Sequence, residues 1–310
     1  MRKEYRIDVP EAEDIPQFVK VLDDLATGNN VFLVGGAGTG KTTLAEKISY
    51  SLFGRQENDG EELPYVIVNC NQWTSPIDLI GGQTIEGYKE GRLIRAWREG
   101  KILILEEMPK LDANTAGILN DALAKSAKDG AIIFNGKSEP VKKHPMFGCM
   151  ATGNVLGKSL SSSYVGNNVQ DASLLDRFSG CIYRIGFNEK LERHLVYPAV
   201  VDICLKLRKS ILRYEGKGAN DDDTEDIMTL RTMMNMQRTY ELEMKRELGM
   251  VKKLPNGKTL KDALESYMNT MSQDKARKVA AEVNLEAFYN SYKGKAMKDV
   301  FQIEYKRRQG

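Results

Sequence analysis

Through the first 187 residues, short apolar runs alternate with longer amphipathic segments. Each run is apolar almost throughout, as expected of parallel strands that are buried on both faces. Strands separated by helical patterns are typical of a parallel sheet with crossover helices. The sequence therefore predicts an α/β core with a five-stranded parallel sheet, whose strands are Val31 to Val34, Tyr65 to Cys70, Ile102 to Leu105, Met146 to Ala151 and Cys181 to Ile185.

Two segments interrupt this alternation. A Gly-rich insertion occupies Gly81 to Leu93. Between the third and fourth strands, Asn135-Gly136 separates an apolar run from a polar one. Because this dipeptide favours tight hairpin turns, it predicts a β-hairpin before the fourth strand.

From Asn188 onward the strand pattern stops and helical periodicity takes over. We expect helices over Leu191 to Arg213 and over about Ile227 to Leu248, with the acidic run at Asp221 to Asp223 forming a solvated linker between them. The predicted domains are an α/β core over 1–187, a helical region over 188–249 and a helical C-terminal extension over 250–310.

The composition is that of an ordinary soluble globular protein and excludes a disordered or collagen-like chain. The 310 residues carry a net charge of 45 − 43 = +2 and are 41% hydrophobic. No apolar run approaches the roughly 20 residues that a membrane-spanning helix needs, and the N-terminus lacks the apolar segment of a secretory signal. We therefore expect a cytoplasmic protein. Two histidines and four scattered cysteines make a zinc site or a His-based triad a poor explanation of its chemistry.

The strongest chemical signal is GGAGTGKTT, which fits the phosphate-loop pattern G-x-x-x-x-G-K-[ST] directly after the first strand and before a helix. Its N–H groups would face phosphates at the positive end of that helix. Lys41 would reach the β and γ phosphates, and the Thr42 hydroxyl would bind Mg²⁺. The predicted nucleotide-binding residues are Gly35, Gly36, Ala37, Gly38, Thr39, Gly40, Lys41, Thr42 and Thr43.

Three further elements supply groups that a phosphate-transfer site needs. Two carboxylates, Glu106 and Glu107, end the third strand, where a metal ion and an attacking water are held. Glu106 takes the metal-side position and Glu107 the water-polarising one. Asn154 follows the fourth strand, where an amide could orient the water or contact the γ-phosphate. Arg177, in SLLDRF, could stabilise charge on the transferred group from a neighbouring subunit, although an Asp-Arg surface pair would look the same.

In their order and spacing, GGAGTGKTT, ILILEEM, ATGN and LLDRF resemble an AAA+ ATPase. The stretch from NCNQWTSPIDLIGG to GILNDAL is more closely similar to the MoxR branch, with its CbbQ/NorQ and cobalt-chelatase small-subunit relatives. That branch has an insertion within helix 2, which matches Gly81 to Leu93, and a hairpin before sensor 1. The resemblance covers residues 25 to about 190 well and the helical region loosely.

The resemblance assigns roles to the candidate residues. It implies that Glu106 and Glu107 form Walker B, that Asn154 is sensor 1 and that Arg177 is the arginine finger. Region 188–249 would be the lid, and Arg231 is the best candidate for a sensor 2 arginine. One departure is notable, because the family has Asp where this chain has Glu106, and the extra methylene could shift the Mg²⁺ hydration shell or slow turnover.

The resemblance also implies partners. A trans-acting arginine requires a ring, which in this family is a homo-hexamer whose ATP hydrolysis remodels a client protein, often one with a von Willebrand factor A domain. Trp73, Tyr88 and Lys89 could line the pore or contact the client, and Trp73 could equally pack under the insertion.

Two other functions stay open. The first is a nucleotide-gated assembly protein that hydrolyses little ATP, which Glu106 would explain. The second is a nucleic-acid motor or loader, suggested by the 13 Lys/Arg against 7 Asp/Glu of residues 250–310. No nucleic-acid signature motif accompanies that charge, and a solvated helical face explains it at least as well.

Overall fold

The computed structural model describes residues 15–55, 60, 62–126, 130–154, 172–218, 226–252 and 255–309. The acidic run at 221–223 lies outside these ranges. The chain forms two compact units. The α/β unit consists of the residues up to Gly36 and of Gly40–Ile185, and the helical unit consists of Ala37–Thr39 and the residues from Gly186 onward.

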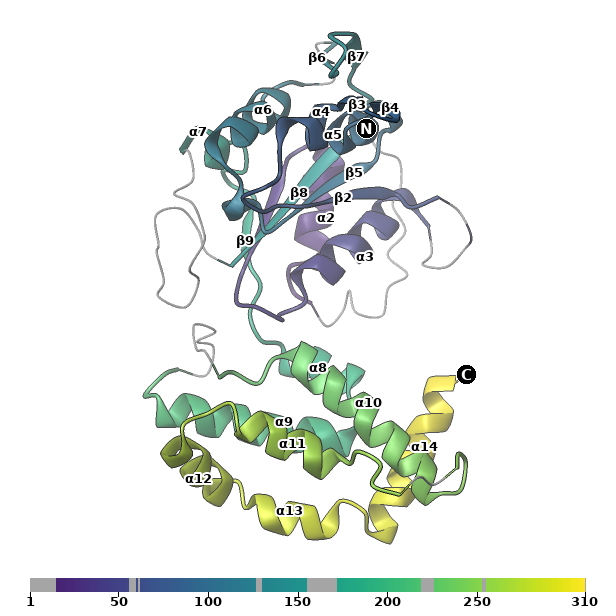
Figure 1. Ribbon diagram of the computed structural model, residues 1–310, viewed down its shortest axis with the longest axis vertical. Helices are drawn as coiled ribbons and strands as arrows, with labels where there is room; N and C mark the ends of the chain where they lie inside the picture. The colour runs from purple at the N-terminus through teal and green to yellow at the C-terminus, as the bar shows by residue number, and fades with distance from the viewer. Residues whose placement is uncertain are drawn as a thin grey trace. The chain divides into compact units, whose positions relative to one another are not determined.

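The α/β unit is built around a parallel sheet whose strand order is β2-β5-β8-β1-β9 (Figure 1). The predicted five-stranded parallel sheet is therefore confirmed. The elements of this unit are α2 (Phe18–Thr27), β1 (Val31–Val34), α3 (Lys41–Phe53), β2 (Tyr65–Asn69), α4 (Pro76–Ile80), β3 (Gly82–Thr84), β4 (Gly87–Lys89), α5 (Arg92–Glu99), β5 (Ile102–Glu106), the 3-10 helix Met108–Lys110, α6 (Ala113–Leu123), β6 (Ile132–Phe134), β7 (Pro140–Lys142), β8 (Gly148–Gly153), α7 (Ala172–Asp176) and β9 (Ile182–Arg184).

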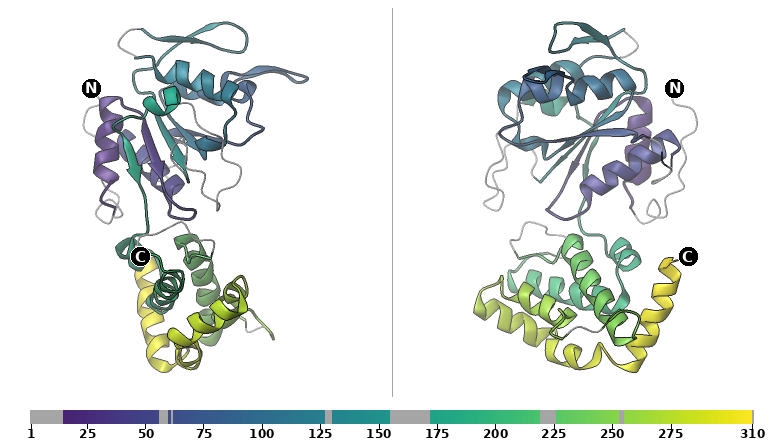
Figure 2. Two further views of the ribbon diagram at one scale, coloured as in Figure 1. Left: turned by 90° about the vertical axis from the view of Figure 1, so that its left-hand side faces the viewer. Right: turned by 45° about the vertical axis from the view of Figure 1, so that its right-hand side comes forward.

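The sheet separates two hydrophobic cores, because successive side chains of a strand point to opposite faces. Val31 and Leu33 of β1 pack with α2 and α3 on one face. Phe32 and Val34 of the same strand pack with helices α4 to α7 on the other face. Figure 2 shows this sandwich of helices around the sheet. Burial on both faces explains why the strands are apolar without alternation.

Two antiparallel hairpins project from this core. β3 and β4 form the hairpin of the Gly-rich insertion, and β6 and β7 form the hairpin that Asn135-Gly136 predicted. The Asn135 side chain accepts hydrogen bonds from the N–H groups of Lys137 and Glu139, which fixes the turn. The Gly136 N–H donates to the Ile80 carbonyl at 2.9 Å, so the second hairpin is bonded to the start of the insertion.

The fourth sheet strand begins and ends two residues later than its sequence predicted. Residues His144 to Phe147 form a turn, in which the Phe147 N–H donates to the His144 carbonyl. β8 then continues as far as Gly153, because it is paired with β1 up to Val34. Pairing with neighbouring strands, which is not visible in a local hydrophobic pattern, sets both ends.

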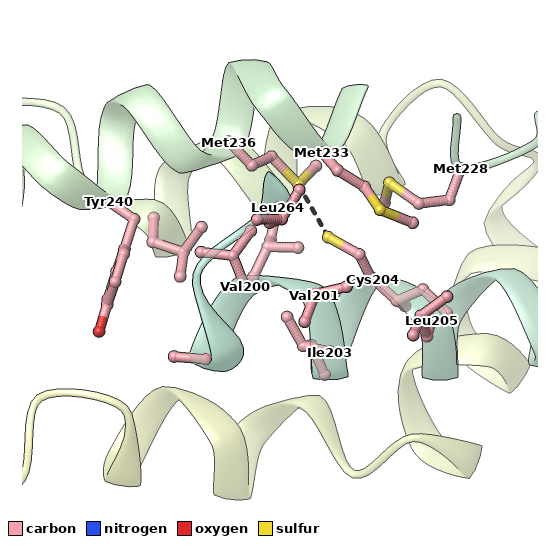
Figure 3. Packing of buried hydrophobic residues seen from close by; sticks show 14 of the residues in the cluster. Val200, Val201, Ile203, Cys204, Leu205, Met228, Met233, Met236, Tyr240 and Leu264 are labelled. Carbon is pink, nitrogen blue, oxygen red and sulfur yellow. Dashed lines mark hydrogen bonds between the residues drawn. The ribbon is translucent and has the colours of Figure 1, made fainter. Parts of the chain in front are cut away.

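The helical unit packs its helices around one core (Figures 1 and 3). In Figure 3 the thiol of Cys204 lies 3.6 Å from the sulfur of Met236 among aliphatic side chains. Among the residues described here, no helix is both long enough and apolar enough to cross a membrane. The helices are α8 (Glu189–Leu195), α9 (Pro198–Tyr214), α10 (Leu230–Glu247), α11 (Leu260–Met268), α12 (Gln273–Glu282), α13 (Leu285–Ser291) and α14 (Lys295–Gln309).

The helix predicted over Leu191 to Arg213 is divided into α8 and α9. The break falls at Val196 and Tyr197, immediately before Pro198, which is the first residue of α9. A proline lacks an N–H and disfavours the helical conformation in the residue before it, whereas it suits the first turn of a new helix. The single long helix was therefore wrong, and Pro198 was the signal that should have divided it.

Candidate nucleotide site

The loop between β1 and α3 needs glycine at three positions. A Cβ atom on Gly35 would lie 1.9 Å from the main-chain oxygen of Ile185. Gly38 and Gly40 have φ values of 71° and 87°, in the left-handed region that glycine tolerates best. The helix begins at Lys41, and the N–H groups of a helix's first turn have no acceptor within the helix itself. These are the features of an anion-binding helix start.

Lys41 is the buried cation of this site, with 8% of its surface exposed. Its Nζ donates hydrogen bonds to the main-chain oxygens of Gly35, at 2.8 Å, and Gly36, at 2.7 Å. It also donates to Oδ1 of Asn154 at 3.0 Å. Asn154 directly follows β8, which lies beside β1 in the sheet, and this adjacency places its amide against the loop. Two residues predicted from motifs 113 positions apart are thus in contact.

The hydroxyl of Thr42 donates a 2.7 Å hydrogen bond to Oε1 of Glu106, the last residue of β5. A hydroxyl oxygen and a carboxylate oxygen side by side are hard donors of the kind that Mg²⁺ selects. The side chains of Thr42 and Glu106, which the sequence assigned to the metal, are therefore suited to Mg²⁺.

Glu107 has an unusual backbone, with φ 56° and ψ 42°. A non-glycine residue in this left-handed region costs roughly 1–2 kcal/mol. The Glu107 N–H donates to the Thr152 hydroxyl at 3.1 Å, and its carboxylate pairs with Lys110. Backbone strain held by surrounding contacts is common at functional sites. Thr152, which is 1% exposed, was missed by the sequence analysis, because its contact with Glu107 joins β8 to the end of a different strand.

Burial raises the pKa of the Cys70 thiol to about 12, and the negative charges of Glu106 and Glu107 add to this effect. Cys70 follows β2, and its N–H donates to the Glu106 carbonyl at 2.8 Å. A thiol with such a pKa remains protonated near neutral pH and is a poor nucleophile. Cys70 therefore packs beside the site without supplying covalent chemistry.

Arg177 lies just after α7. Its Nε donates to Oδ1 of Asn120 at 2.8 Å, and Asn120 belongs to α6. Over the ranges that the structure describes, this side chain is not hydrogen-bonded to the phosphate loop or to the acidic strand end. Arg231 is exposed near the start of α10 in the helical unit, and its sensor 2 role stays a prediction.

The three residues assigned to pore or client contact differ in their surroundings. Trp73 is 81% exposed, so it does not pack beneath the insertion. Tyr88 is half-buried, and its hydroxyl donates to the Ile80 carbonyl at 3.3 Å. The Lys137 ammonium lies 4.5 Å from the centre of the Tyr88 ring, which joins the two hairpins. Lys89 is exposed on β4.

Similar sequences are known. The chain is 31% identical over 176 residues to the uncharacterized protein YojN of Bacillus subtilis, a match that covers 54% of this chain and 52% of YojN. It is 23% identical over 256 residues to the uncharacterized protein SH1500 of Staphylococcus haemolyticus, covering 76% and 89% of the two chains. The first match thus spans about half the length of its relative.

A solved structure with a related backbone is NtrX from Brucella abortus in complex with ATP. It has a TM-score of 0.48 and 16% sequence identity, and the alignment covers 95% of this chain and 64% of that one. Residues 30–178 match the family described as AAA domain (dynein-related subfamily). These residues include the phosphate loop, the acidic strand end, Asn154 and Arg177. This part of the α/β unit is therefore similar to the AAA domain family.

Proposed function

We propose that this protein binds Mg–ATP and hydrolyses it to ADP and phosphate. The observation that carries this proposal is the convergence at the strand ends, where Lys41 contacts Asn154 and Thr42 contacts Glu106. Four residues from three separate motifs form two adjacent pairs, on a helix start suited to phosphate. An AAA domain over the same residues supports the assignment.

In this mechanism the loop N–H groups and Lys41 bind the phosphate oxygens, which replace the main-chain oxygens now bonded to Nζ. Thr42 and Glu106 would hold Mg²⁺, which supplies positive charge that offsets charge on the phosphates. Asn154 orients the attacking water beside the γ-phosphate. Glu107 accepts the proton of that water as the new P–O bond forms and the bond to the β-phosphate oxygen breaks, which releases ADP.

We further propose a homo-hexameric ring in which Arg177 of one copy completes the site of the next. A guanidinium that stabilises a transferring phosphoryl group can be supplied in trans. Arg177 has no hydrogen bond to its own phosphate loop over the described ranges, which fits such a role. The insertion, the second hairpin and the resemblance to the MoxR branch support assignment to that branch.

The work done by hydrolysis would be remodelling of a client protein, and a partner with a von Willebrand factor A domain is the one that the resemblance suggests. The exposed indole of Trp73, with Ile85 at the tip of the β3–β4 hairpin and Phe134 on β6, supplies large apolar side chains for such a contact. Aromatic and aliphatic anchors of this kind dominate the energy of protein interfaces.

The test is steady-state phosphate release over a range of protein concentrations, with particle size followed with and without Mg–ATP. We expect specific activity to rise with concentration as rings form. Glu107→Gln should bind ATP and assemble while its turnover falls about a thousandfold, since general base catalysis contributes 10²- to 10⁴-fold. Turnover that is unchanged in Glu107→Gln would overturn the site.

The second candidate function is a nucleotide-gated assembly protein with little hydrolysis. The observation that favours it is Glu106, which contacts the Thr42 hydroxyl directly with a side chain one methylene longer than the family's Asp. Assembly driven by ATP, without phosphate release at any concentration, would select this candidate over the first.

A further inference from the structure

The segment that carries Arg177 is anchored through its main chain. The Arg177 N–H donates to the Leu174 carbonyl at 3.1 Å, which closes the turn after α7. The Arg177 carbonyl accepts a 3.2 Å hydrogen bond from the side-chain amide of Asn30, which immediately precedes β1. The neighbouring Phe178 is fully buried against Phe32 of that strand, with ring centres 5.8 Å apart. The backbone of Arg177 is therefore fixed to the sheet.

The side chain of Arg177 is oriented by a second asparagine. Oδ1 of Asn120 accepts the hydrogen bond from the Arg177 Nε at 2.8 Å. The amide nitrogen of Asn120 donates to the Ser173 hydroxyl of α7, also at 2.8 Å. If the amide turned over, its nitrogen would face the Nε–H of Arg177, which can only donate, and this bond would be lost. Asn120 thus presents its oxygen, and not its nitrogen, to the guanidinium.

From this geometry we propose that Asn120 is a positioning residue for Arg177 as a trans-acting arginine. The inference rests on the proposed ATPase ring and adds a residue to it. A guanidinium has five N–H donors in a rigid plane, and the bond at Nε sets the direction of that plane. The two terminal nitrogens are then presented together, as a fork suited to the oxygens of a phosphoryl group in the neighbouring copy.

The chemistry of the amide suits this role. A carboxylate at position 120 would form a charge-assisted pair with Arg177 and compete with the phosphate for it. A neutral oxygen that accepts one bond orients the guanidinium without neutralising it. Asn120 lies on α6, the helix that follows the acidic strand end and the 3-10 helix, so the orienting group is held on a rigid element.

The first test measures ATP turnover by assembled Asn120→Ala and Asn120→Asp. We expect turnover to fall about ten- to a hundredfold in both, since a small misplacement of a catalytic group can cost that much. Arg177→Ala should lose about a thousandfold. The control is Asn114→Ala, which removes an exposed asparagine from the same helix and should leave turnover unchanged.

The second test separates positioning of the arginine from damage to the variant's own site. Asn120→Ala is mixed with Glu107→Gln, whose sites are inactive but whose Arg177 is intact. In mixed rings, Asn120→Ala sites receive Arg177 from Glu107→Gln neighbours, so activity should rise above the sum of the separate proteins. Mixing Asn120→Ala with Arg177→Ala should restore nothing, because both lack an oriented arginine.

The outcomes are distinct. Restoration by Glu107→Gln alone supports the inference. Wild-type turnover in Asn120→Ala, or loss that Glu107→Gln does not restore, overturns it. If instead Arg177→Ala turns over ATP as fast as the wild type, the proposed ring with Arg177 acting in trans is wrong. Melting temperatures measured without nucleotide identify any variant that does not fold. If Asn120→Ala does not fold, Asn120→Asp, whose side chain has nearly the same shape as asparagine, replaces it in the mixing test.

Discussion

Two buried cations, Lys41 of the α/β unit and Arg208 of the helical unit, serve different purposes. In the α/β unit, Lys41 is buried at the ends of the strands and bonded to groups of the phosphate loop. In the helical unit, buried charges join one helix to another. Arg208 of α9 forms a two-point ion pair with Glu192 of α8, and its Nε donates to the Met228 carbonyl at 2.7 Å.

A second buried charge in the helical unit, Glu243, also joins different helices. The carboxylate of Glu243 on α10 accepts from the N–H of Leu260, at the start of α11, at 2.8 Å. It also accepts from the hydroxyl of Tyr292, after α13, at 3.0 Å. Parallel strands bring their ends together at one edge, so polar groups gather there into a site. Helices in a bundle meet along their lengths, and their buried polar groups form hydrogen bonds and ion pairs that stabilise the packing of one helix on another. Burial of Lys41 therefore indicates ligand chemistry, whereas burial of Arg208 and Glu243 indicates stability.

The largest effect that follows from this difference is on stability. Arg208→Ala leaves the Glu192 carboxylate, which is 2% exposed, without its two-point partner. Breaking a buried ion pair by removing one partner costs about 3–5 kcal/mol. We expect the free energy of unfolding of the helical unit to fall by that amount, as measured by urea denaturation followed by circular dichroism.

The matched control is Lys209→Ala, one residue along α9. Lys209 pairs with Glu189, but its side chain is 58% exposed. Such surface pairs contribute about 0–1 kcal/mol. Equal losses for the two variants would mean that burial does not distinguish the pairs, and the stability role of Arg208 would be wrong.

The next effect is on binding. Lys41→Ala removes the ammonium that phosphate oxygens would contact, and hydrogen bonds to charged groups contribute about 1.5–3 kcal/mol each. We expect ATP affinity to fall by about a hundredfold, which is near 3 kcal/mol. The free energy of unfolding without nucleotide should fall by less than in Arg208→Ala, by about 1–3 kcal/mol, because the oxygens of Gly35 and Gly36 lose a donor. Isothermal titration calorimetry and urea denaturation measure the two, with Lys47→Ala on the same helix as control.

Tight ATP binding by Lys41→Ala would overturn the phosphate-loop assignment. A loss of stability as large as that of Arg208→Ala would instead show that the two buried cations do not differ in purpose. Either result would remove the distinction between the units.

The two units also differ in how far the sequence predicted them. In the α/β unit the phosphate loop, the acidic strand end and the parallel sheet were predicted, because glycines and strands buried on both faces leave local signatures. Contacts made by short polar side chains across the fold were missed. Asn120 and Arg177 are 57 positions apart, and Thr152 supports Glu107 from a neighbouring strand. No local pattern identifies such pairs.

In the helical unit, periodicity predicted the helices but not the buried ion pairs that hold them together. Arg208 and Glu192 look like ordinary solvated charges on amphipathic segments. Only the packing of α8 against α9 shows that both are buried. Sequence patterns report what one element requires, whereas a buried ion pair depends on where two elements meet.

A third prediction concerns pH. Lys275 on α12 is 6% exposed and contacts both Glu215 and Asp226. Burial alone would lower the pKa of Lys275, but its hydrogen bonds to Glu215 and Asp226 outweigh that effect and raise the pKa above the ordinary 10.5. The folded state thus holds this proton more tightly than the unfolded state. The stabilisation is complete below pH 10.5 and is lost as pH rises through the folded pKa.

The free energy of unfolding of Lys275→Met should therefore be about 1–2 kcal/mol lower than that of the wild type at pH 8, where the charged hydrogen bonds are present. The difference between the two proteins should shrink as the pH is raised above 10.5. Thermal denaturation at a series of pH values measures it, with Lys278→Met, an exposed lysine of the same helix, as control. A difference that grows with pH would reverse the predicted sign.

The smallest effect distinguishes hydrolysis from nucleotide-gated assembly. Glu106→Asp withdraws the carboxylate by one methylene from the Thr42 hydroxyl, which it now contacts at 2.7 Å. One hydrogen bond between side chains contributes about 0.5–1.5 kcal/mol, so a few-fold change in turnover is expected. If the direct contact restricts the room for Mg²⁺ and its waters, the shorter residue should raise phosphate release and lower the Mg²⁺ concentration required for half-maximal rate. A fall in both activity and Mg²⁺ affinity would instead show that Glu106 is matched to this loop, and that the departure from the family's Asp does not slow this site.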